Sequence, residues 1–332
     1  MRRTWLSLIA LLAGCSVGGA LDPPAPVAPL DTTPIADAII AGEGGEPLAI
    51  SRWGPATPAA VILAVHGFGD YGPSTFAQAA AHWAEEGIAT YAYDQRGFGR
   101  NPSRGFWPGA EELRRDLATI ARQVRARHPC RALVVVGHSM GGGVALAAAP
   151  HLAEAGSADG IILAAPAIWG GDALNPLHRA AAWATAAVVP ERRISGRGLV
   201  RIQPSDNIEM LRDLGRDPLY LAPPSAREIL GLVRIVDRAA AAAPRADLPA
   251  LLLLGTKDEI VPNSRVAEVF ARLPGPRGVR RYADGWHMLF RDNQARRVWR
   301  DVADWTLLQT APDCPEDRIV SQSDLALAPS SP

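Results

Sequence analysis

Cysteine, charge of one sign and metal-binding motifs are the features that this sequence has least of. Three cysteines in 332 residues are too few for a disulfide scaffold. The 34 basic residues are balanced by 34 acidic ones, so no basic excess is available to neutralise a nucleic-acid backbone. No Cys-x-x-Cys pair, His-Glu-x-x-His helix or Gly-x-x-x-x-Gly-Lys-[Ser/Thr] loop occurs. The sequence therefore predicts no metal, no organic cofactor and no nucleic-acid partner.

The overall composition is that of a folded protein. Hydrophobic residues make up 48% and charged residues 20% of the chain, which excludes wholesale disorder. The length allows one large domain or two small ones. A chain of this size buries enough apolar surface to fold without disulfide or metal support.

The first 14 residues are predicted to be a lipoprotein signal peptide. Arg2 and Arg3 form a basic start, and the apolar run Trp5–Ala13 suits a signal peptide but is short for a bilayer span. The run ends in Leu-Ala-Gly-Cys, which resembles the bacterial lipobox, in which Cys15 carries the lipid. Ser16 rather than Asp follows, and this favours a lipid-anchored protein of the outer membrane. An ordinary signal peptide or an uncleaved anchor is the alternative.

Four further segments are distinguished by composition. Residues 15–36 are rich in Pro and Ala and are predicted to be a tether. Residues 313–332 are expected to form a flexible tail. The α/β core is expected to comprise residues 37–167 and 247–312, interrupted by a helical insertion at residues 168–246, which is too long for a loop.

The core alternates predicted strands and helices. Continuous apolar runs of this kind suit a mostly parallel sheet covered by helices on both faces. Residues 37–54 are expected to add an antiparallel hairpin. The predicted strands are Ala60–Val65, Ile88–Tyr93, Ala132–Val136, Gly160–Ala165, Leu248–Leu254 and Gly278–Tyr282; the helices are Thr75–Glu86, Gly109–His128, Met140–Ala149, Asn263–Leu273 and Asp292–Leu308. The fold class is therefore α/β, with Pro176–Val189 and Ser225–Ala243 as helices of a lid.

The sharpest chemical motif is Gly-His-Ser-Met-Gly at residues 137–141. It fits Gly-x-Ser-x-Gly between a strand and a helix, where a tight turn exposes the Ser139 hydroxyl. A serine hydroxyl is a weak nucleophile that needs a base, and the base needs an orienting carboxylate. Ser139 is therefore the candidate nucleophile.

Two later strands are followed by candidates for these partners. Asp258 follows the fifth apolar strand and His287 follows the sixth, so the chain order is Ser, Asp, His. Glu259 is an alternative carboxylate. His138 and Asp94 also lie at strand ends, and we interpret both as structural.

The motif His66-Gly67-Phe68-Gly69 follows the first apolar strand. Glycines there allow the backbone to approach a substrate closely. The backbone N–H groups of Phe68 and Met140 are the expected donors of an oxyanion hole.

These motifs together resemble the monoacylglycerol lipase/lysophospholipase group of α/β-hydrolases, of the serine aminopeptidase S33 type. The resemblance covers about residues 37–310 and implies the α/β-hydrolase fold with a helical lid. One departure is Asp70-Tyr71-Gly72-Pro73, where the group usually has an acidic residue, His and Ser. The residues that carry the resemblance are His66-Gly67-Phe68-Gly69-Asp70, Asp94-Gln95-Arg96-Gly97-Phe98-Gly99, Arg104-Gly105-Phe106, Gly137-His138-Ser139-Met140-Gly141-Gly142, Asp258, Val261-Pro262 and Trp286-His287.

The resemblance implies acyl transfer through Ser139, His287 and Asp258. A monoacylglycerol or lysophospholipid-like ester is the expected substrate, because the lid helix Pro176–Val189 is apolar and a lipid anchor is expected beside it. Two alternatives stay open: an aminopeptidase, and a non-catalytic envelope lipoprotein that keeps the fold.

Two cysteines remain once Cys15 is assigned to lipid. Cys130 precedes the strand that leads to Ser139, and Cys314 follows the last predicted helix. Because export permits disulfides, Cys130 and Cys314 are expected to pair, with two free thiols as the alternative.

Overall fold

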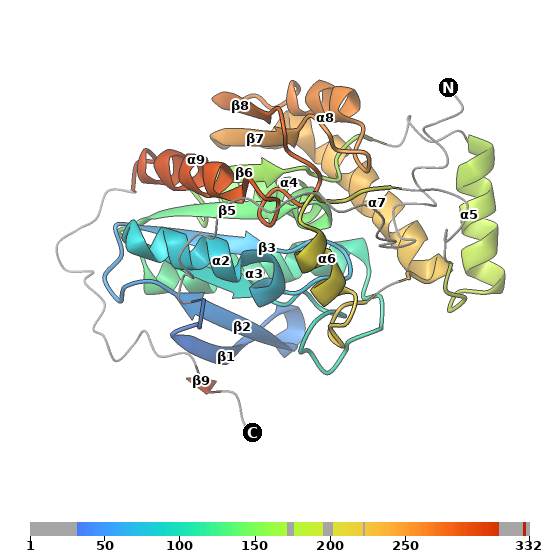
Figure 1. Cartoon of the computed structure of the whole chain (residues 1–332), viewed down its shortest axis with the longest axis horizontal. Helices are drawn as coiled ribbons and strands as arrows, with labels where there is room; N and C mark the ends of the chain where they lie inside the picture. Colours follow the sequence, from blue (N-terminus) through green and yellow to red (C-terminus); the bar gives the residue numbers. More distant parts are fainter. Residues whose placement is uncertain (1–31, 171–175, 195–201, 222, 312–327, 330–332) are drawn as a thin grey trace.

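The computed structural model describes residues 32–170, 176–194, 202–221, 223–311 and 328–329. Its centre is a sheet in the order β8-β7-β6-β5-β3-β4-β2-β1-β9 (Figure 1). All neighbouring pairs from β4 through β3 to β8 are parallel, and β2 and β1 extend the sheet in antiparallel pairing. The strands are β1 (Ala36–Ala41), β2 (Pro47–Trp53), β3 (Ala60–Val65), β4 (Ile88–Tyr93), β5 (Ala132–His138), β6 (Gly160–Ala164), β7 (Ala250–Gly255), β8 (Arg277–Tyr282) and β9 (Ala328–Pro329).

The central strands form where the sequence is continuously apolar. Every residue of β3 and β4 is buried, as expected for strands covered on both faces. The edge strand β8 is mostly exposed and is correspondingly rich in Arg. The apolar runs therefore predict the strands well where both faces are covered.

Helices cover the sheet in two groups. In one group α2 packs against α9, and in the other α4 packs against α3 and α7. The amphipathic α9 buries Val298, Trp299 and Val302 against the core. The bounds are α2 (Gly72–Glu85), α3 (Ala110–Arg127), α4 (Met140–Glu154), α7 (Ala226–Ala242), α8 (Asn263–Phe270) and α9 (Ala295–Leu307).

The predicted lid of residues 168–246 divides into two parts. Helix α7 begins with a capping box between Ser225 and Glu228 and lies along α4, so it belongs to the helix layer of the core. The remaining helices, α5 (Pro176–Val188) and α6 (Ile208–Leu214), lie outside that layer. The sequence predicted α5 but not α6. We call residues 202–221 the lid segment.

The ends of the chain fall largely outside the described residues. These include Cys15, the signal peptide, most of the tether and most of the tail. Within the predicted tail, β9 pairs with β1. Cys130 is disulfide-bonded, and Cys314, its predicted partner, lies outside the described residues. Among the helices that were searched, none has the length and apolar character needed to cross a membrane.

Candidate active site

Ser139 lies on the tight turn between β5 and α4. Its backbone has φ 53° and ψ −116°, a conformation that non-glycine residues rarely adopt. Glycine at position 141 makes the turn possible, because a Cβ there would lie 2.1 Å from the carbonyl oxygen of Val65. The turn therefore holds Ser139 in a strained conformation at the end of the central strand, with its backbone close to β3.

The sheet register brings the predicted site loops to one edge. Val65 pairs with Tyr93 and with Gly137, so β3, β4 and β5 end at the same level. Gly255 pairs with Tyr282, which aligns the ends of β7 and β8. The loops that follow these strands therefore meet, although they are far apart in the sequence.

Ser139, His287 and Asp258 form a continuous hydrogen-bonded chain. The Nε2 of His287 lies 2.9 Å from the Ser139 Oγ, and its Nδ1 lies 2.9 Å from an Asp258 carboxylate oxygen. This arrangement assigns the proton of the neutral ring to Nδ1, which donates to Asp258, and leaves Nε2 to accept from the serine hydroxyl. The structure thus brings together the three residues that the motifs singled out.

The carboxylate of Asp258 is held by the backbone that follows it. Its other oxygen accepts N–H bonds from Ile260 (2.8 Å) and Val261 (3.0 Å), and the side chain is fully buried. Glu259, the alternative carboxylate, is exposed and accepts the N–H of Gln203 in the lid segment. The carboxylate that contacts His287 is therefore Asp258, whereas Glu259 is bonded to the lid segment.

His138 supports the backbone of His287. Its Nε2 lies 3.0 Å from the carbonyl oxygen of His287, and the two rings are 5.2 Å apart. Burial, together with the neighbouring His287, lowers the pKa of His138 to about 3. A neutral ring of this kind donates from Nε2 to that carbonyl, which agrees with a structural role.

The predicted oxyanion donors lie on the two sides of Ser139. We call residues 66–71 the oxyanion loop. A Cβ on Gly67 would be 3.3 Å from the Cβ of Ser139, so this loop passes directly beside the nucleophile. Phe68 is half-buried and packs its ring against Phe98 and Trp107. Met140, at the start of α4, is buried. The site therefore has backbone on both sides of the serine.

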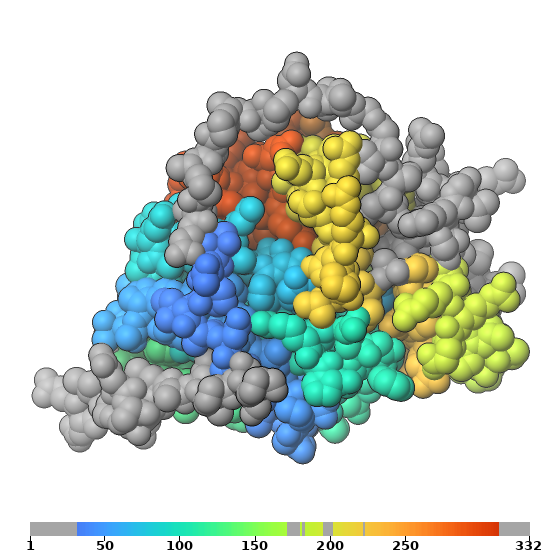
Figure 2. All heavy atoms as spheres, turned by 60° about the horizontal axis from the view of Figure 1, so that its bottom comes forward, coloured from blue at the N-terminus to red at the C-terminus, as the bar shows by residue number. Residues whose placement is uncertain are grey.

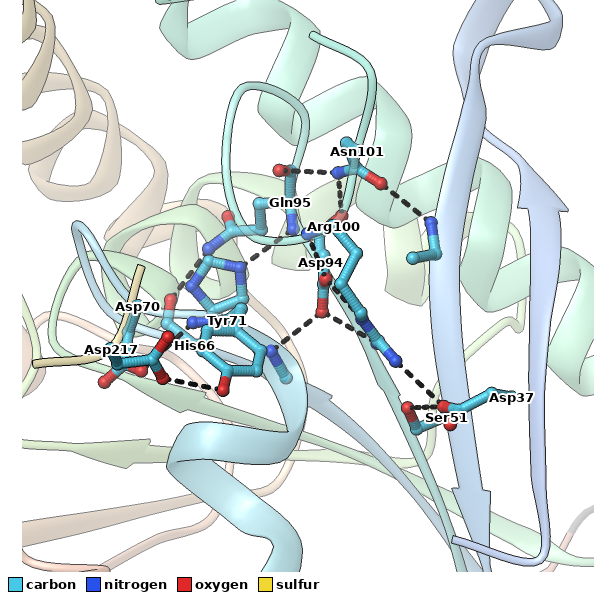
Figure 3. Close-up of polar contacts among 12 residues, drawn as sticks. Asp37, Ser51, His66, Asp70, Tyr71, Asp94, Gln95, Arg100, Asn101 and Asp217 are labelled. Atoms are coloured by element: carbon cyan, nitrogen blue, oxygen red, sulfur yellow. Dashed lines mark hydrogen bonds and ion pairs between the residues drawn. The ribbon is translucent and has the colours of Figure 1, made fainter. Parts of the chain in front are cut away.

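A buried polar network around His66 and Gln95 supports the oxyanion loop (Figure 3). The Nε2 of His66 accepts the N–H of Gln95 at 2.8 Å, and the Gln95 side chain donates to the His66 carbonyl at 2.7 Å. The Nδ1 of His66 therefore carries the proton and donates to the Gly67 carbonyl at 2.7 Å. Burial lowers the pKa of His66, so the ring stays neutral.

Asp94 connects this network to the edge of the sheet. Its fully buried carboxylate accepts the N–H of Gly72 and a pair of bonds from the Arg100 guanidinium. Arg100 continues to Asp37 of β1 (Figure 3). Asn101 donates to the carbonyls of Asp94 and Gln95. Asp94 is therefore a structural anchor for the start of α2, as the sequence indicated.

A buried ion pair joins the oxyanion loop to the loop that carries His287. We call residues 283–294 the histidine loop. Asp70 pairs with Arg291, and both are almost completely buried. Arg291 also donates to the Ser74 hydroxyl at 3.1 Å. The motifs include Asp70 but predict no partner for it, and Arg291 is not predicted at all, because nothing local distinguishes this arginine from the others.

The lid segment crosses the site and contacts both loops. Figure 2 shows it in yellow, running between the cyan and the orange-red parts of the surface. Tyr71 donates to Asp217 at 2.8 Å, and the N–H of Leu221 donates to the Gly69 carbonyl at 2.8 Å. On the other side, the N–H of Met288 donates to the Pro204 carbonyl at 3.0 Å. None of these contacts was predicted.

A small apolar cluster lies between the lid segment and the histidine loop. It is separate from the main core and includes Met288, the residue after His287. Its other members all come from the lid segment: Leu211 and Leu214, with Ile208, Met210 and Tyr220 packed against them. The lid segment therefore places apolar side chains beside the histidine. Among the residues that were searched, no group of His, Cys, Asp and Glu could hold a metal ion.

Comparison with known proteins agrees with this architecture. A family model described as serine aminopeptidase, S33, matches residues 56–294. A monoacylglycerol lipase of Mycolicibacterium smegmatis is 26% identical over 272 residues, which cover 80% of this chain and 94% of the relative. A monoglyceride lipase of Rattus norvegicus is 26% identical over 258 residues, covering 75% and 82%.

Solved structures share the fold. A soluble variant of monoglyceride lipase from Saccharomyces cerevisiae superposes with a TM-score of 0.70 at 20% identity, covering 85% of this chain and 98% of that one. A Paleococcus ferrophilus monoacylglycerol lipase gives a TM-score of 0.66 at 22% identity, covering 78% and 98%. The predicted α/β-hydrolase fold is thereby confirmed.

Proposed function

This chain belongs to the α/β-hydrolase family described as serine aminopeptidase, S33, and we propose that it hydrolyses carboxylic esters with Ser139 as the nucleophile. One observation carries the proposal: the hydrogen-bonded chain from Ser139 through His287 to Asp258, each bond 2.9 Å long. The same three residue types in this geometry perform acyl transfer on several unrelated folds.

The mechanism follows from the bonds of the three side chains. His287 takes the hydroxyl proton through Nε2 as the Ser139 oxygen forms a bond to the ester carbonyl carbon. Asp258 holds the ring and stabilises the imidazolium. The carbonyl oxygen becomes an oxyanion beside the N–H groups of Phe68 and Met140. The C–O bond of the ester then breaks, and the alcohol leaves with the proton from His287.

Water completes the cycle. His287 accepts a proton from a water molecule, whose oxygen forms a bond to the acyl carbon. The bond between that carbon and Ser139 breaks, and the serine oxygen recovers the proton from His287. The carboxylic acid is released, and the enzyme returns to its initial state.

The substrate proposed is a lipid with one acyl chain, of the monoacylglycerol or lysophospholipid type. Two curated relatives are named as a monoacylglycerol lipase and a monoglyceride lipase. Ile208, Met210 and Tyr220, the half-buried members of the apolar cluster beside Met288, offer a surface for an acyl chain.

We also propose that lipidation of Cys15 anchors the protein to the outer membrane of a bacterial envelope. Helix α5 supports a position near lipid, because Trp183 (61% exposed) and Val188 (78% exposed) leave a large apolar surface in contact with solvent. In Figure 2 this helix (yellow-green) stands at the side of the molecule. Replacing Cys15 with Ala should move the protein from the membrane fraction to the soluble fraction; unchanged fractionation would refute the anchor.

Aminopeptidase activity requires a carboxylate that holds the amine of the substrate. Asp70, the acidic group of the oxyanion loop, is paired with Arg291 and buried, so it is not available for this purpose. The oxyanion loop therefore supplies no free carboxylate for a substrate amine.

The deciding experiment uses the detergent-solubilised full chain and its Ser139→Ala variant. Both are assayed on p-nitrophenyl esters from acetate to palmitate, on monoolein and on aminoacyl p-nitroanilides. Ester hydrolysis that falls by about 10⁴-fold or more in Ser139→Ala would support the proposal. Cleavage of anilides alone would indicate a peptidase. No turnover together with no labelling of Ser139 by a fluorophosphonate would indicate a non-catalytic lipoprotein.

A further inference from the structure

The backbone of the histidine loop is held on both sides of His287. The N–H of Trp286, the residue before it, donates to an Asp292 carboxylate oxygen at 2.7 Å. The N–H of Met288, the residue after it, donates to the Pro204 carbonyl at 3.0 Å. The loop has no regular secondary structure at this point, so these bonds fix the position from which the imidazole projects.

Both supports lead to the same place in the lid segment. The second Asp292 oxygen accepts the Ser205 hydroxyl at 2.7 Å. Ser205 is fully buried and Asp292 is 3% exposed, so water does not compete for this bond. Ser205 also accepts the N–H of Asn207 at 3.2 Å, which orients its hydroxyl toward Asp292. Asp292 therefore bridges the residue before His287 and the residue after Pro204.

No other function of the fold accounts for this buried carboxylate. The guanidinium of the adjacent Arg291 is directed to Asp70 and Ser74, and within the described residues no cation pairs with Asp292. A buried anion without a paired cation is costly, and here the carboxylate accepts two hydrogen bonds, one from Trp286 within the histidine loop and one from Ser205 of the lid segment.

We propose that Asp292 is a positioning residue for the reaction, which holds His287 in hydrogen-bond reach of Ser139 by joining the histidine loop to Ser205 of the lid segment. The inference rests on the proposed function. Loss of the bridge frees the Trp286 end of the loop and moves the imidazole, whereas the acyl-binding surface is largely retained. A misplacement of a general base by about 1 Å costs on the order of 10²-fold in rate.

The test compares two aspartates of the same junction. Asp292 and Asp206 each accept one backbone N–H of the histidine loop, from Trp286 (2.7 Å) and from Asn293 (2.9 Å) respectively. Only the first of these flanks His287. Asp206→Ala is thus a matched control, which removes a carboxylate from the same junction without freeing the residues beside the base.

The readouts are kcat and KM on p-nitrophenyl butyrate and the rate at which a fluorophosphonate labels Ser139. Asp292→Ala is expected to lower kcat and the labelling rate by about 10- to 100-fold, with KM changed less than threefold. Asp292→Asn keeps an oxygen for the Trp286 N–H. On a logarithmic scale, its kcat should recover at least a third of the decrease seen in Asp292→Ala. Asp206→Ala should stay within threefold of the unaltered protein.

Several results would overturn the inference. These are a kcat of Asp292→Ala within threefold of the starting value, an effect confined to KM, or an equal loss in Asp206→Ala. If Asp292→Ala fails to fold, Ser205→Ala decides, because it keeps the carboxylate but cuts its bond to the lid segment; a three- to tenfold fall in kcat is expected, and no change refutes the bridge. Ester hydrolysis abolished by Ser139→Ala in the otherwise unaltered protein shows that such a failure concerns Asp292 and not the proposed function.

Discussion

The oxyanion loop and the histidine loop face the same serine, but they are held by different parts of the molecule. The oxyanion loop is supported by His66, Gln95 and Asp94, which are buried at the ends of central strands. The histidine loop follows the exposed edge strand β8 and is tied through Asp292 and Met288 to the lid segment. Both loops contact the lid segment, but the buried network under the oxyanion loop belongs to the core, whereas the buried carboxylate of the histidine loop is bonded to the lid segment.

This difference indicates which of the two loops can move when a substrate binds. Buried hydrogen bonds between central strands open only when the core opens, whereas the lid segment has few core contacts of its own. A displacement of the lid segment therefore disturbs His287 before it disturbs the base of the oxyanion loop. The following predictions test this comparison in order of decreasing expected effect.

The largest effect on kcat is expected at Asp258, the residue that joins His287 to the loop after β7. Asp258 lies just beyond β7. In Asp258→Asn the amide oxygen stays on the N–H groups of Ile260 and Val261, so an NH2 group faces Nδ1 of His287 and favours the wrong tautomer. We expect kcat for ester hydrolysis to fall by about 10⁴-fold. Glu259→Gln is the neighbouring control and should stay within twofold; a larger loss in Glu259→Gln would reverse the assignment.

The next effect concerns the support of the oxyanion side. Arg100→Ala leaves the fully buried Asp94 without its guanidinium partner. We expect the free energy of unfolding, measured with urea, to fall by about 3–5 kcal/mol. Because Arg100 and Ser205 share no hydrogen-bond partner, the loss should be the same within about 0.5 kcal/mol in a Ser205→Ala background. A larger coupling energy would show that the two loops are not independently supported.

The buried Asp70 of the oxyanion loop and the buried Asp292 of the histidine loop should change the stability of the fold with pH in opposite directions. Burial raises the pKa of Asp70, but the Arg291 guanidinium and the hydrogen bond from Ser74 outweigh it, so the pKa lies below its ordinary value. Asp70 therefore stabilises the fold above the ordinary pKa of 3.8, and this contribution is lost as the pH falls through the lowered value. Asp70→Asn should lack this loss of stability in acid.

Asp292 should behave in the opposite way. Burial raises its pKa to about 6; the bonds from Ser205 and Trp286 and the charge of His287 lower it, and the charge of Asp206 raises it further. Its contribution to stability is fully present below its ordinary pKa of 3.8 and is lost as the pH rises through about 6.

Urea denaturation at pH 4 and pH 7 checks this sign. Between these values Asp292→Asn should lose less stability than the unaltered protein, by about 2 kcal/mol. If the stability of Asp292→Asn changed with pH as much as that of the unaltered protein, the raised pKa of Asp292 would be contradicted.

The smallest effect is expected at the outer rim of the oxyanion loop. Tyr71→Phe removes one half-buried hydrogen bond to Asp217 of the lid segment, worth about 1 kcal/mol. Because the bonds between His66 and Gln95 still support the oxyanion loop, kcat should change less than twofold. KM for long-chain esters should rise by about fivefold, since about 1 kcal/mol of lid closure is lost. A tenfold fall in kcat would show that the lid also positions the oxyanion loop.

Local signals in the sequence were sufficient for much of the fold. The runs Ala60–Val65 and Ile88–Tyr93 became β3 and β4 without a change of bounds, because a strand covered on both faces is apolar at nearly every position. Helix α6 was missed because it is short, although Asn207 caps it by accepting the N–H of Met210. That asparagine is the signal that would have indicated it.

The extent of the lid could not be judged in the same way. The amphipathic pattern of α7 indicates a helix with one buried face, but it does not say what covers that face. The covering element is α4, more than seventy residues earlier in the chain. Packing partners of this kind are set by the whole fold, so the pattern of residues 168–246 does not indicate that α7 packs in the helix layer of the core.

The nucleophile, its base and the orienting carboxylate could be proposed from the chain alone, since each follows an apolar strand and strand ends meet at one edge of a parallel sheet. The bridge of Asp292 to Ser205 and the pair of Asp70 with Arg291 could not, because their partners lie 87 and 221 residues apart and carry no local pattern. Local composition selects strands, turns and helices over short distances. Which buried charge receives which partner is decided only when the folded chain excludes water and leaves a single neighbour within hydrogen-bond reach.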